Sequence, residues 1–576
     1  MAFLSQRLKF LFVLLGHFKL CFSNHEPQVC ISSGCIRGST IETNFDNRKV
    51  CSFRGIFYAE VPERFTDAVP KQSFDGVFDA TKDGPVCVQR ESIKFGDEII
   101  VIGEEDCLTI NVYTPAATNP PSNNSLPVFV LFHFGSWVEG SNREAIYGPE
   151  FLLNRDVVLA VPNYRLDAIG FLNTGDNVTI GNYGFRDQVL ALQWVQDNIA
   201  AFGGDPSRVT LIGESSGGSA ATLHLMSPLS KERPVAANAT QRLAELVGCP
   251  VCPSEDLTNC MRNVPAETLI LAQVNLTSDR FPPFVQLYFL PTLDYDYLAN
   301  PTFPFDPRIA DMTEPIPLMT GSITNDGLFY LSAVYNIPGF EELIYKYYKY
   351  FLARLMDLGH LFPMYAIPTV MDRVYSRYFQ DQPLSRDYQS NLKQMFTDYD
   401  FFITTAIPAL RHAKIGAPTW YYVYDYETEV SFNDLLFDPS ISNTLDKPGH
   451  LDNLLTLFPM PEYFPNRTYS DAEIEFIRNR VDLWVTFAAT GKSGNVQRLI
   501  RRFFLARECS PSPFGRSEPT TAGIVATQRL IDCRPEFTVR GDYVLMSFIS
   551  FFDHIQEFRA PLLPQPRART TPSRIW

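Results

Sequence analysis

The chain has 576 residues, of which 45% are hydrophobic and 20% charged, and these proportions are typical of a globular protein rather than a disordered one. Its formal net charge of −15 disfavours nucleic acid and anionic membrane surfaces as partners, although such a charge can equally serve solubility alone. No apolar stretch is long enough to span a bilayer, so we expect no membrane span.

The N-terminus has the pattern of a secretory signal. Arg7 and Lys9 precede an apolar run over 10–15, and small residues stand at the −3 and −1 positions of a cleavage after Ser23. We therefore expect residues 1–23 to be a signal peptide and the mature protein to be secreted.

Eleven cysteines indicate disulfide-closed loops in an oxidising compartment. Without Cys21, which would leave with the signal, they form four clusters: Cys30, Cys35 and Cys51; Cys87 and Cys107; Cys249, Cys252 and Cys260; Cys509 and Cys533. No cluster has histidines at zinc-binding spacing, so we predict no metal site. Five Asn-x-Ser/Thr sequons are glycosylation candidates: Asn123, Asn177, Asn238, Asn275 and Asn466.

The first half of the chain alternates strand-like runs with a helix. The apolar runs over 108–113, 128–132 and 157–161 predict buried strands, because they are too short for most helices and rich in β-favouring residues. A helix is predicted over 187–199 and another strand over 209–212. This alternation predicts a parallel α/β sheet. The helix should bury one face made of Val189, Leu192, Val195 and Ile199.

The second half predicts more helix than strand. We expect an aromatic-rich helical insertion over about 340–412, and further strands over 317–320 and 420–424. Residues 24–560 show no domain boundary and so predict one large domain. Residues 561–576 are rich in Pro and Arg and predict a disordered tail.

The strand over 209–212 runs into a Gly-x-Ser-x-Gly turn over 213–217, which a helix-compatible run follows. A strand, a tight turn and a helix are the context in which a serine becomes an exposed nucleophile. Glycines flank Ser215 because neighbouring Cβ atoms would clash in so tight a turn. The helix would also present its positive end to the site. Ser215 is therefore a candidate nucleophile.

A nucleophilic serine needs a base, and the base needs an acid to orient it. In this arrangement the acid follows the serine in the chain, and a histidine follows the acid. Asp326 closes a loop after the strand over 317–320, although Asp-Gly is also a common turn. His450 follows a strand and a Pro-Gly loop, although a loop histidine is often only a surface residue. The histidines that lie far enough downstream are His360, His412, His450 and His554.

Three further segments closely resemble the type-B carboxylesterase/cholinesterase family: residues 182–188, residues 200–206 and the Glu105-Asp106-Cys107-Leu108 motif. With the serine turn, the resemblance covers nearly the whole mature chain. It implies an α/β-hydrolase fold with a large, mostly parallel central sheet flanked by helices. It also implies hydrolysis of a small-molecule carboxylic ester through an acyl-enzyme, with no cofactor.

The resemblance further implies roles for individual residues. Ser215 would be the nucleophile, His450 the base and Asp326 the acid, where the family usually has Glu. The backbone N–H groups of Gly135, Ser136 and Ser216 would form the oxyanion hole.

No tryptophan lies between Cys87 and Cys107, the cysteines of the first expected disulfide. Cholinesterases carry a choline-binding tryptophan there, so a cholinesterase is not expected. The disulfides implied are Cys87–Cys107 and Cys249–Cys260; Cys252 is then extra, and we also expect Cys509 to pair with Cys533.

The oxyanion residues depart from the family pattern. Family members usually carry three glycines after the position of His133 and an alanine after the nucleophile, whereas this chain has Phe134-Gly135-Ser136 and Ser216. A backbone donor survives a change of side chain. If Ser136 adopts a positive φ, however, it costs on the order of 1 kcal/mol relative to glycine.

A second departure follows the serine helix. Family members carry a further apolar strand there, but this chain passes from Ser230 through residues 231–234 almost directly into the next helix. Loss of a central strand would leave backbone groups of its neighbours unpaired and the core unfilled.

The retained triad favours an enzyme. Two alternatives stay open: a catalytically inactive, cholinesterase-like binding or adhesion protein, and a truncated form from a skipped or mispredicted exon. The oligomeric state does not follow from the sequence.

Overall fold

The computed structural model describes residues 26–91, 100–115, 125–225, 234–278, 289–291, 315–492 and 529–532, with short gaps at 337–338, 357, 359–363, 383, 438 and 443–444. Within these residues no helix has both the length and the apolar character that a membrane crossing requires. The expected signal peptide over 1–23, the expected tail over 561–576, the sequon at Asn123 and the expected Cys509–Cys533 pair lie outside the described residues.

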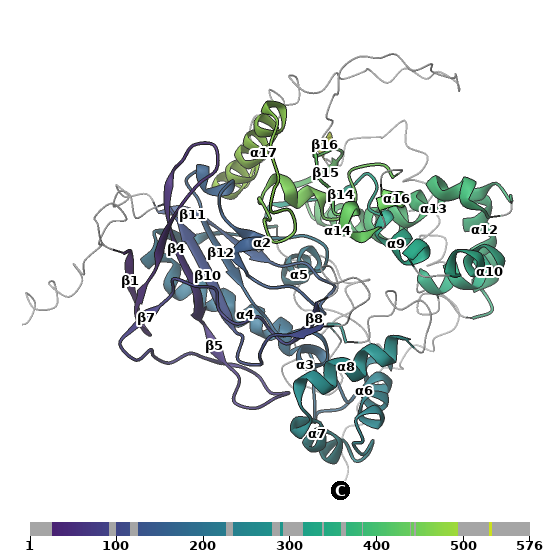
Figure 1. The fold of residues 1–576 in the computed structure, drawn as a ribbon, viewed down its shortest axis with the longest axis horizontal. Helices are drawn as coiled ribbons and strands as arrows, with labels where there is room; N and C mark the ends of the chain where they lie inside the picture. Colours follow the sequence, from purple (N-terminus) through teal and green to yellow (C-terminus); the bar gives the residue numbers. More distant parts are fainter. Residues whose placement is uncertain are drawn as a thin grey trace, which may run out of the picture.

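A six-stranded sheet forms the core of the left half of the molecule in Figure 1. In spatial order its strands are β13 (Gly204–Gly213), β11 (Leu126–Phe132), β12 (Val158–Pro162), β10 (Thr109–Thr114), β4 (Lys49–Phe57) and β3 (Ser39–Glu42). The pairs β13–β11 and β11–β12 are parallel, whereas the other three pairs are antiparallel. The sheet is therefore mixed rather than mostly parallel. The reason is that only the strands joined by helical crossovers pair in parallel, as that geometry requires.

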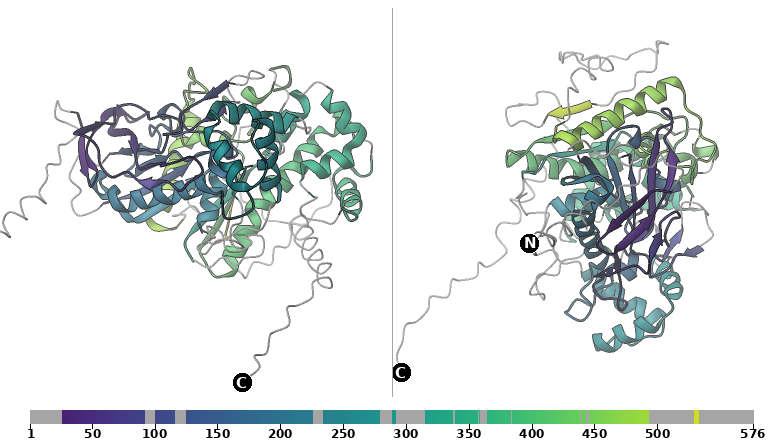
Figure 2. Two further views of the ribbon diagram at one scale, coloured as in Figure 1. Left: turned by 90° about the horizontal axis from the view of Figure 1, so that it is seen from below. Right: turned by 90° about the vertical axis from the view of Figure 1, so that its left-hand side faces the viewer.

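Both faces of this sheet are buried, as the alternation along β11 shows. Val128, Val130 and Phe132 belong to a core that includes α4 (Tyr183–Asn198). Phe129 and Leu131 belong to a second core on the other side, with α17 (Asp471–Thr490). Figure 2 shows α17 running along the outside of the strands. The sheet is thus a layer between helices, as in the predicted α/β fold.

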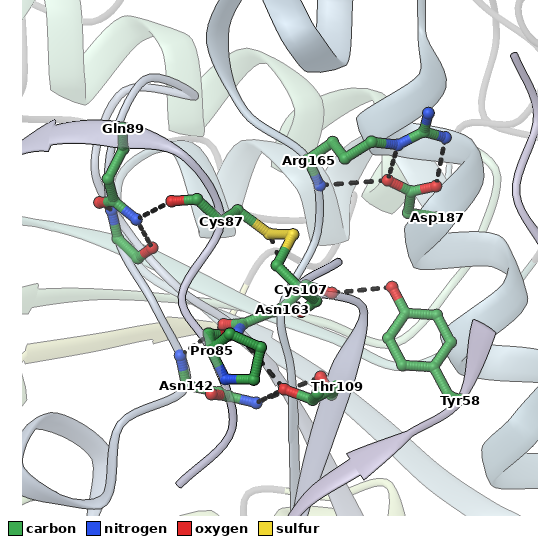
Figure 3. Close-up of a disulfide and its surroundings, with 11 residues drawn as sticks. Tyr58, Pro85, Cys87, Gln89, Cys107, Thr109, Asn142, Asn163, Arg165 and Asp187 are labelled. Atoms are coloured by element: carbon green, nitrogen blue, oxygen red, sulfur yellow. Dashed lines mark hydrogen bonds and ion pairs between the residues drawn. A yellow bond between two sulfur atoms is a disulfide. The ribbon is translucent and has the colours of Figure 1, made fainter. Parts of the chain in front are cut away.

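The buried face of α4 differs from the one that the hydrophobic pattern predicts. Val195 and Ile199 are buried, but Val189 is 48% exposed. The buried face includes Asp187 instead, which is 0% exposed. Arg165 donates to the Asp187 carboxylate from Nε and from a terminal guanidinium nitrogen, both at 2.7 Å (Figure 3). A pattern of apolar residues cannot reveal a buried ion pair, and this one sets the rotation of the helix.

Two helical groups flank the sheet. The helices α6 (Pro234–Leu246), α7 (Ser254–Asn263) and α8 (Ala266–Ser278) gather at the bottom of Figure 1. The expected helical insertion lies at the right and is built around a hydrophobic core of its own. Its helices are α9 (Leu328–Asn336), α10 (Phe340–Leu355), α12 (Ile367–Phe379), α13 (Gln389–Phe396), the π-helix η5 (Thr397–Phe402) and α14 (Ile403–Lys414).

The cysteine clusters form short-range disulfides. Cys87–Cys107 and Cys249–Cys260 are both present, as the resemblance implied, and Cys30 is joined to Cys35. Cys51 is buried and also disulfide-bonded. Cys252 is an exposed free thiol.

The strands after the serine form a separate sheet. It consists of β14 (Leu318–Ile323), β15 (Thr419–Tyr424) and β16 (Arg529–Asp532), with β14 and β15 parallel. Among the described strands, β13 pairs only with β11 and β14 pairs only with β15, so each is an edge strand. Between α5 (Ser216–Leu225) and β14 the described residues contain no strand. This split is the arrangement expected if a central strand is missing.

The split sheet predicts a longer form of the protein. We expect transcripts to carry further in-frame codons between those of Ser230 and Pro234, which encode an apolar strand that pairs with β13 and β14. Sequencing of transcripts across codons 225–245 tests this. An uninterrupted read that matches this chain would contradict it and make the split sheet a property of the natural protein.

Candidate active site

The turn between β13 and α5 brings Ser215 to the edge of the sheet. Ser215 has a φ of 54°, in the left-handed region that non-glycine residues rarely adopt. A Cβ on Gly213 would lie 2.2 Å from the backbone of Gly217, and a Cβ on Gly217 would lie 2.1 Å from the carbonyl oxygen of Phe132. Both glycines are therefore required by close backbone contacts, as the sequence predicted for a nucleophile turn.

Ser215, His450 and Asp326 form a hydrogen-bonded chain. His450 Nε2 lies 3.1 Å from Ser215 Oγ, and His450 Nδ1 lies 2.9 Å from Asp326 Oδ1. The second oxygen of Asp326 accepts the N–H of Ile323 at 2.7 Å, so the carboxylate is fixed from both sides. Asp326 and His450 are 3% and 4% exposed. This geometry lets a neutral imidazole take the serine proton while the carboxylate orients the ring.

The other downstream histidines do not reach this chain of hydrogen bonds. His412 is buried within α14, and its Nδ1 lies 2.8 Å from the hydroxyl of Thr419. His360 and His554 lie outside the described residues. Of the described candidates, the structure thus brings His450 alone to the serine.

Glu214, directly before the serine, is a second carboxyl group near the imidazole. Its Oε1 lies 3.6 Å from His450 Nδ1, and its Oε2 is buried without a hydrogen-bond partner among the described residues. Burial raises the pKa of the Glu214 carboxyl to about 7. The Gly-x-Ser-x-Gly pattern does not identify Glu214, since this residue occupies a variable position of the pattern. Its adjacency to Ser215 is the signal that could have identified it.

These carboxylates act on the protonation of His450. Burial disfavours the charged imidazole, but the neighbouring negative charges outweigh it and raise the pKa of His450 to about 9. The charge of Glu214 is the largest single contribution to this rise, and the hydrogen bond to Asp326 and the charge of Asp326 follow as separate contributions. The site therefore stabilises the imidazolium that forms when His450 accepts a proton.

Asp452 holds the loop that carries His450. Its carboxylate accepts hydrogen bonds from Ser431 Oγ at 2.6 Å, from the N–H of Phe432 at 2.7 Å and from the N–H of Gly449 at 2.8 Å. Burial raises the pKa of Asp452 to about 6, although these three donors favour its charged form. Asp452 thus joins the histidine loop to the neighbouring segment.

Two aromatic rings lie against the imidazole. The ring centroids of Phe329, on α9, and Phe401, on η5, lie 5.1 Å and 4.8 Å from that of His450. Both belong to the helical insertion, so this insertion contributes apolar walls to the site. Their role does not follow from the sequence, because an aromatic residue on a helix is more often part of the core.

The expected oxyanion residues lie on a strained loop after β11. Gly135, Ser136 and Trp137 have φ values of 117°, 56° and 66°. A non-glycine residue in this region costs on the order of 1–2 kcal/mol, so the departure at Ser136 noted in the sequence carries this cost. Among the described residues, the backbone N–H groups of Gly135, Ser136 and Ser216 donate to no acceptor. These donors are therefore available to a bound anion.

The side chain of Phe134, directly before Gly135, packs in an aromatic cluster. Its ring centroid lies 5.9 Å from that of Tyr147 and 6.2 Å from that of Phe432, and its N–H donates to the Tyr147 hydroxyl at 3.1 Å. Packing of this ring helps to hold the strained loop at its N-terminal end.

No group of three or more His, Cys, Asp or Glu side chains in the described part of the chain is arranged to hold a metal ion.

The four sequons that the structure describes are at Asn177, Asn238, Asn275 and Asn466.

Comparison with known proteins gives consistent matches. The model of the carboxylesterase family matches residues 25–504. The chain is 34% identical to esterase E4 of Myzus persicae over 510 residues, which cover 84% of this chain and 89% of that one. It is 28% identical to juvenile hormone esterase of Tribolium castaneum, over 85% of this chain and 88% of that one.

A solved structure shares the fold. The crystal structure of juvenile hormone esterase from Manduca sexta, with OTFP covalently attached, superposes with a TM-score of 0.69 at 24% identity. The match covers 82% of this chain and 92% of that one. The architecture described above is thus an α/β-hydrolase fold, as predicted.

Replacement of Glu214→Gln should move the pH profile of ester hydrolysis to lower pH. Catalysis needs neutral His450, so kcat/KM rises as the pH passes through the pKa of this group. Removal of the Glu214 charge weakens the stabilisation of the imidazolium and so lowers the pKa of His450. The measurement is kcat/KM for an aryl ester between pH 5.5 and 10, with the exposed Glu245→Gln as control. An unmoved acid limb would show that this charge does not act on His450.

Proposed function

The chain belongs to the carboxylesterase family and is a carboxylesterase, and from this premise we propose that Ser215, His450 and Asp326 form its catalytic triad. The observation that supports this most is the continuous chain of hydrogen bonds at 3.1 Å and 2.9 Å that joins the three side chains. No cofactor takes part in the proposed reaction.

The first half of the proposed reaction transfers the acyl group to the enzyme. Ser215 Oγ attacks the ester carbonyl carbon while its proton moves to His450 Nε2. The carbonyl oxygen becomes negative and accepts hydrogen bonds from the N–H groups of Gly135, Ser136 and Ser216. The tetrahedral intermediate then releases the alcohol, which takes the proton from Nε2, and an acyl-serine remains.

The second half of the reaction repeats these steps with water. His450 takes a proton from a water molecule, which attacks the acyl carbon, and the resulting oxyanion uses the same donors. Collapse of this intermediate returns the proton from Nε2 to Ser215 Oγ and releases the carboxylic acid. Asp326 stabilises the imidazolium in both halves.

We propose an uncharged, apolar ester as the substrate. The rings of Phe329 and Phe401 beside His450 would contact apolar groups of a bound ester. The relatives include proteins named esterase and juvenile hormone esterase, which supports an ester as the substrate. The N-terminal signal pattern, the disulfides and the sequons support the further proposal that the mature enzyme is secreted and glycosylated.

The proposed nucleophile is tested by covalent labelling of the secreted protein. A fluorophosphonate probe should label the protein once, and Ser215→Ala should abolish the label and lower kcat for aryl esters by at least about 10⁴-fold. A panel of aryl esters of increasing acyl length then measures the acyl preference. Absence of labelling on a well-folded protein would contradict the proposal and favour an inactive, ligand-binding relative.

A further inference from the structure

The C-terminal end of the oxyanion loop is held by one buried side chain, Gln89. Its Oε1 accepts the N–H of Gly140 at 2.6 Å, and its Nε2 donates to the carbonyl of Gly140 at 2.9 Å. The side-chain amide thus pairs with both backbone groups of a single residue, as a neighbouring strand would. Gln89 is 4% exposed and Gly140 is partly exposed, so these bonds lie at the edge of the buried interior.

Gln89 belongs to the loop that the Cys87–Cys107 disulfide closes. Its Nε2 also donates to the carbonyl of Cys87 at 2.9 Å, so both donors of this amide and its acceptor are in use (Figure 3). Its strand, β8 (Gln89–Glu91), pairs with β9 (Ile100–Ile102) within the same loop. The amide therefore joins a covalently closed loop to the loop that carries the expected oxyanion donors.

The position of Gly140 has no space for a side chain. Its φ is 118°, and a Cβ there would lie 2.3 Å from His133 Nδ1 and 2.4 Å from the carbonyl oxygen of Phe134. Between these ends, the carbonyl of Gly135 accepts the N–H groups of Val138 and Glu139, both at 3.0 Å. The loop is therefore a tight turn whose two ends meet beside His133.

This turn contains two non-glycine residues, Ser136 and Trp137, in the left-handed region. Such residues keep this conformation only where the surroundings impose it. The imidazole of His133, stacked on Tyr164 with ring centroids 4.2 Å apart, supports the start of the turn. The pair of hydrogen bonds from Gln89 supports its end.

We propose that Gln89 is a positioning residue for the oxyanion hole. By fixing Gly140 it holds the N–H groups of Gly135 and Ser136 toward the reacting carbonyl oxygen, and it makes the geometry of the hole depend on the Cys87–Cys107 loop. This inference rests on the proposed oxyanion role of these donors. A misplaced donor weakens binding of the transition state much more than binding of the ester itself.

The test compares Gln89→Leu with the wild type and with Gln193→Leu, a change at a glutamine on the outer face of α4. In folded Gln89→Leu, kcat for an aryl ester should fall about 10- to 100-fold with KM changed less than about threefold. Affinity for a trifluoromethyl ketone should fall by a similar factor. Ser215 adds to this ketone through a new Oγ–C bond, its proton passes to His450, and the resulting oxyanion occupies the hole. Gln193→Leu should match the wild type in all three measurements.

An unchanged kcat in folded Gln89→Leu would overturn the proposal, and so would a lower kcat with unchanged ketone affinity. If Gln89→Leu does not fold, Gln89→Glu replaces it, because this variant keeps the acceptor for Gly140 and loses the two donated bonds. Its kcat should lie below the wild-type value, and an unchanged kcat would again overturn the proposal. A wild type that neither hydrolyses esters nor binds the ketone would instead contradict the proposed function itself.

Discussion

The site depends on the close approach of two backbone segments, the start of α5 and the end of β11. The contact of Gly217 with the carbonyl of Phe132 leaves no space for a Cβ, and it seats the helix directly on the strand. In the turn just before this contact, Ser215 adopts a left-handed conformation and its side chain is half-buried. The contact also brings the N-terminus of α5 next to the loop that follows β11. The serine and the expected oxyanion donors are thus neighbours because of a single packing contact.

Buried polar groups hold the frame around this contact. The buried ion pair of Arg165 and Asp187 joins α4 to the segment that follows β12. Loss of one partner of such a pair typically costs about 3–5 kcal/mol, because a charge is left buried alone. Around His450, several carboxyl groups surround a single group that can become positive. Carboxyl groups from three loops converge on one imidazole and favour its charged form. In the proposed mechanism, this cluster stabilises the imidazolium of the reaction intermediate.

Local patterns in the sequence predicted much of the architecture. The runs that became β10, β11, β12, β14 and β15 were recognisable because each is short, apolar and rich in β-favouring residues. Ser215 was recognisable because its glycines are sterically necessary. Long-range contacts were not predictable. The pattern of apolar residues places Val189 in the core, because such a pattern cannot detect the pairing of Asp187 with Arg165. Glu214 and Gln89 act through groups distant in the chain, so only the folded structure reveals their neighbours.

The central claim is that hydrolysis proceeds through an acyl group on Ser215, despite the split between β13 and β14. The most direct measurement is the intact mass of the protein, acid-quenched during turnover of an aryl ester, followed by mapping of the modified peptide. The account predicts a mass increase equal to one acyl group, located on Ser215 and lost as turnover ends. Ester hydrolysis with no acylated protein at any time, or acylation at another residue, would contradict it.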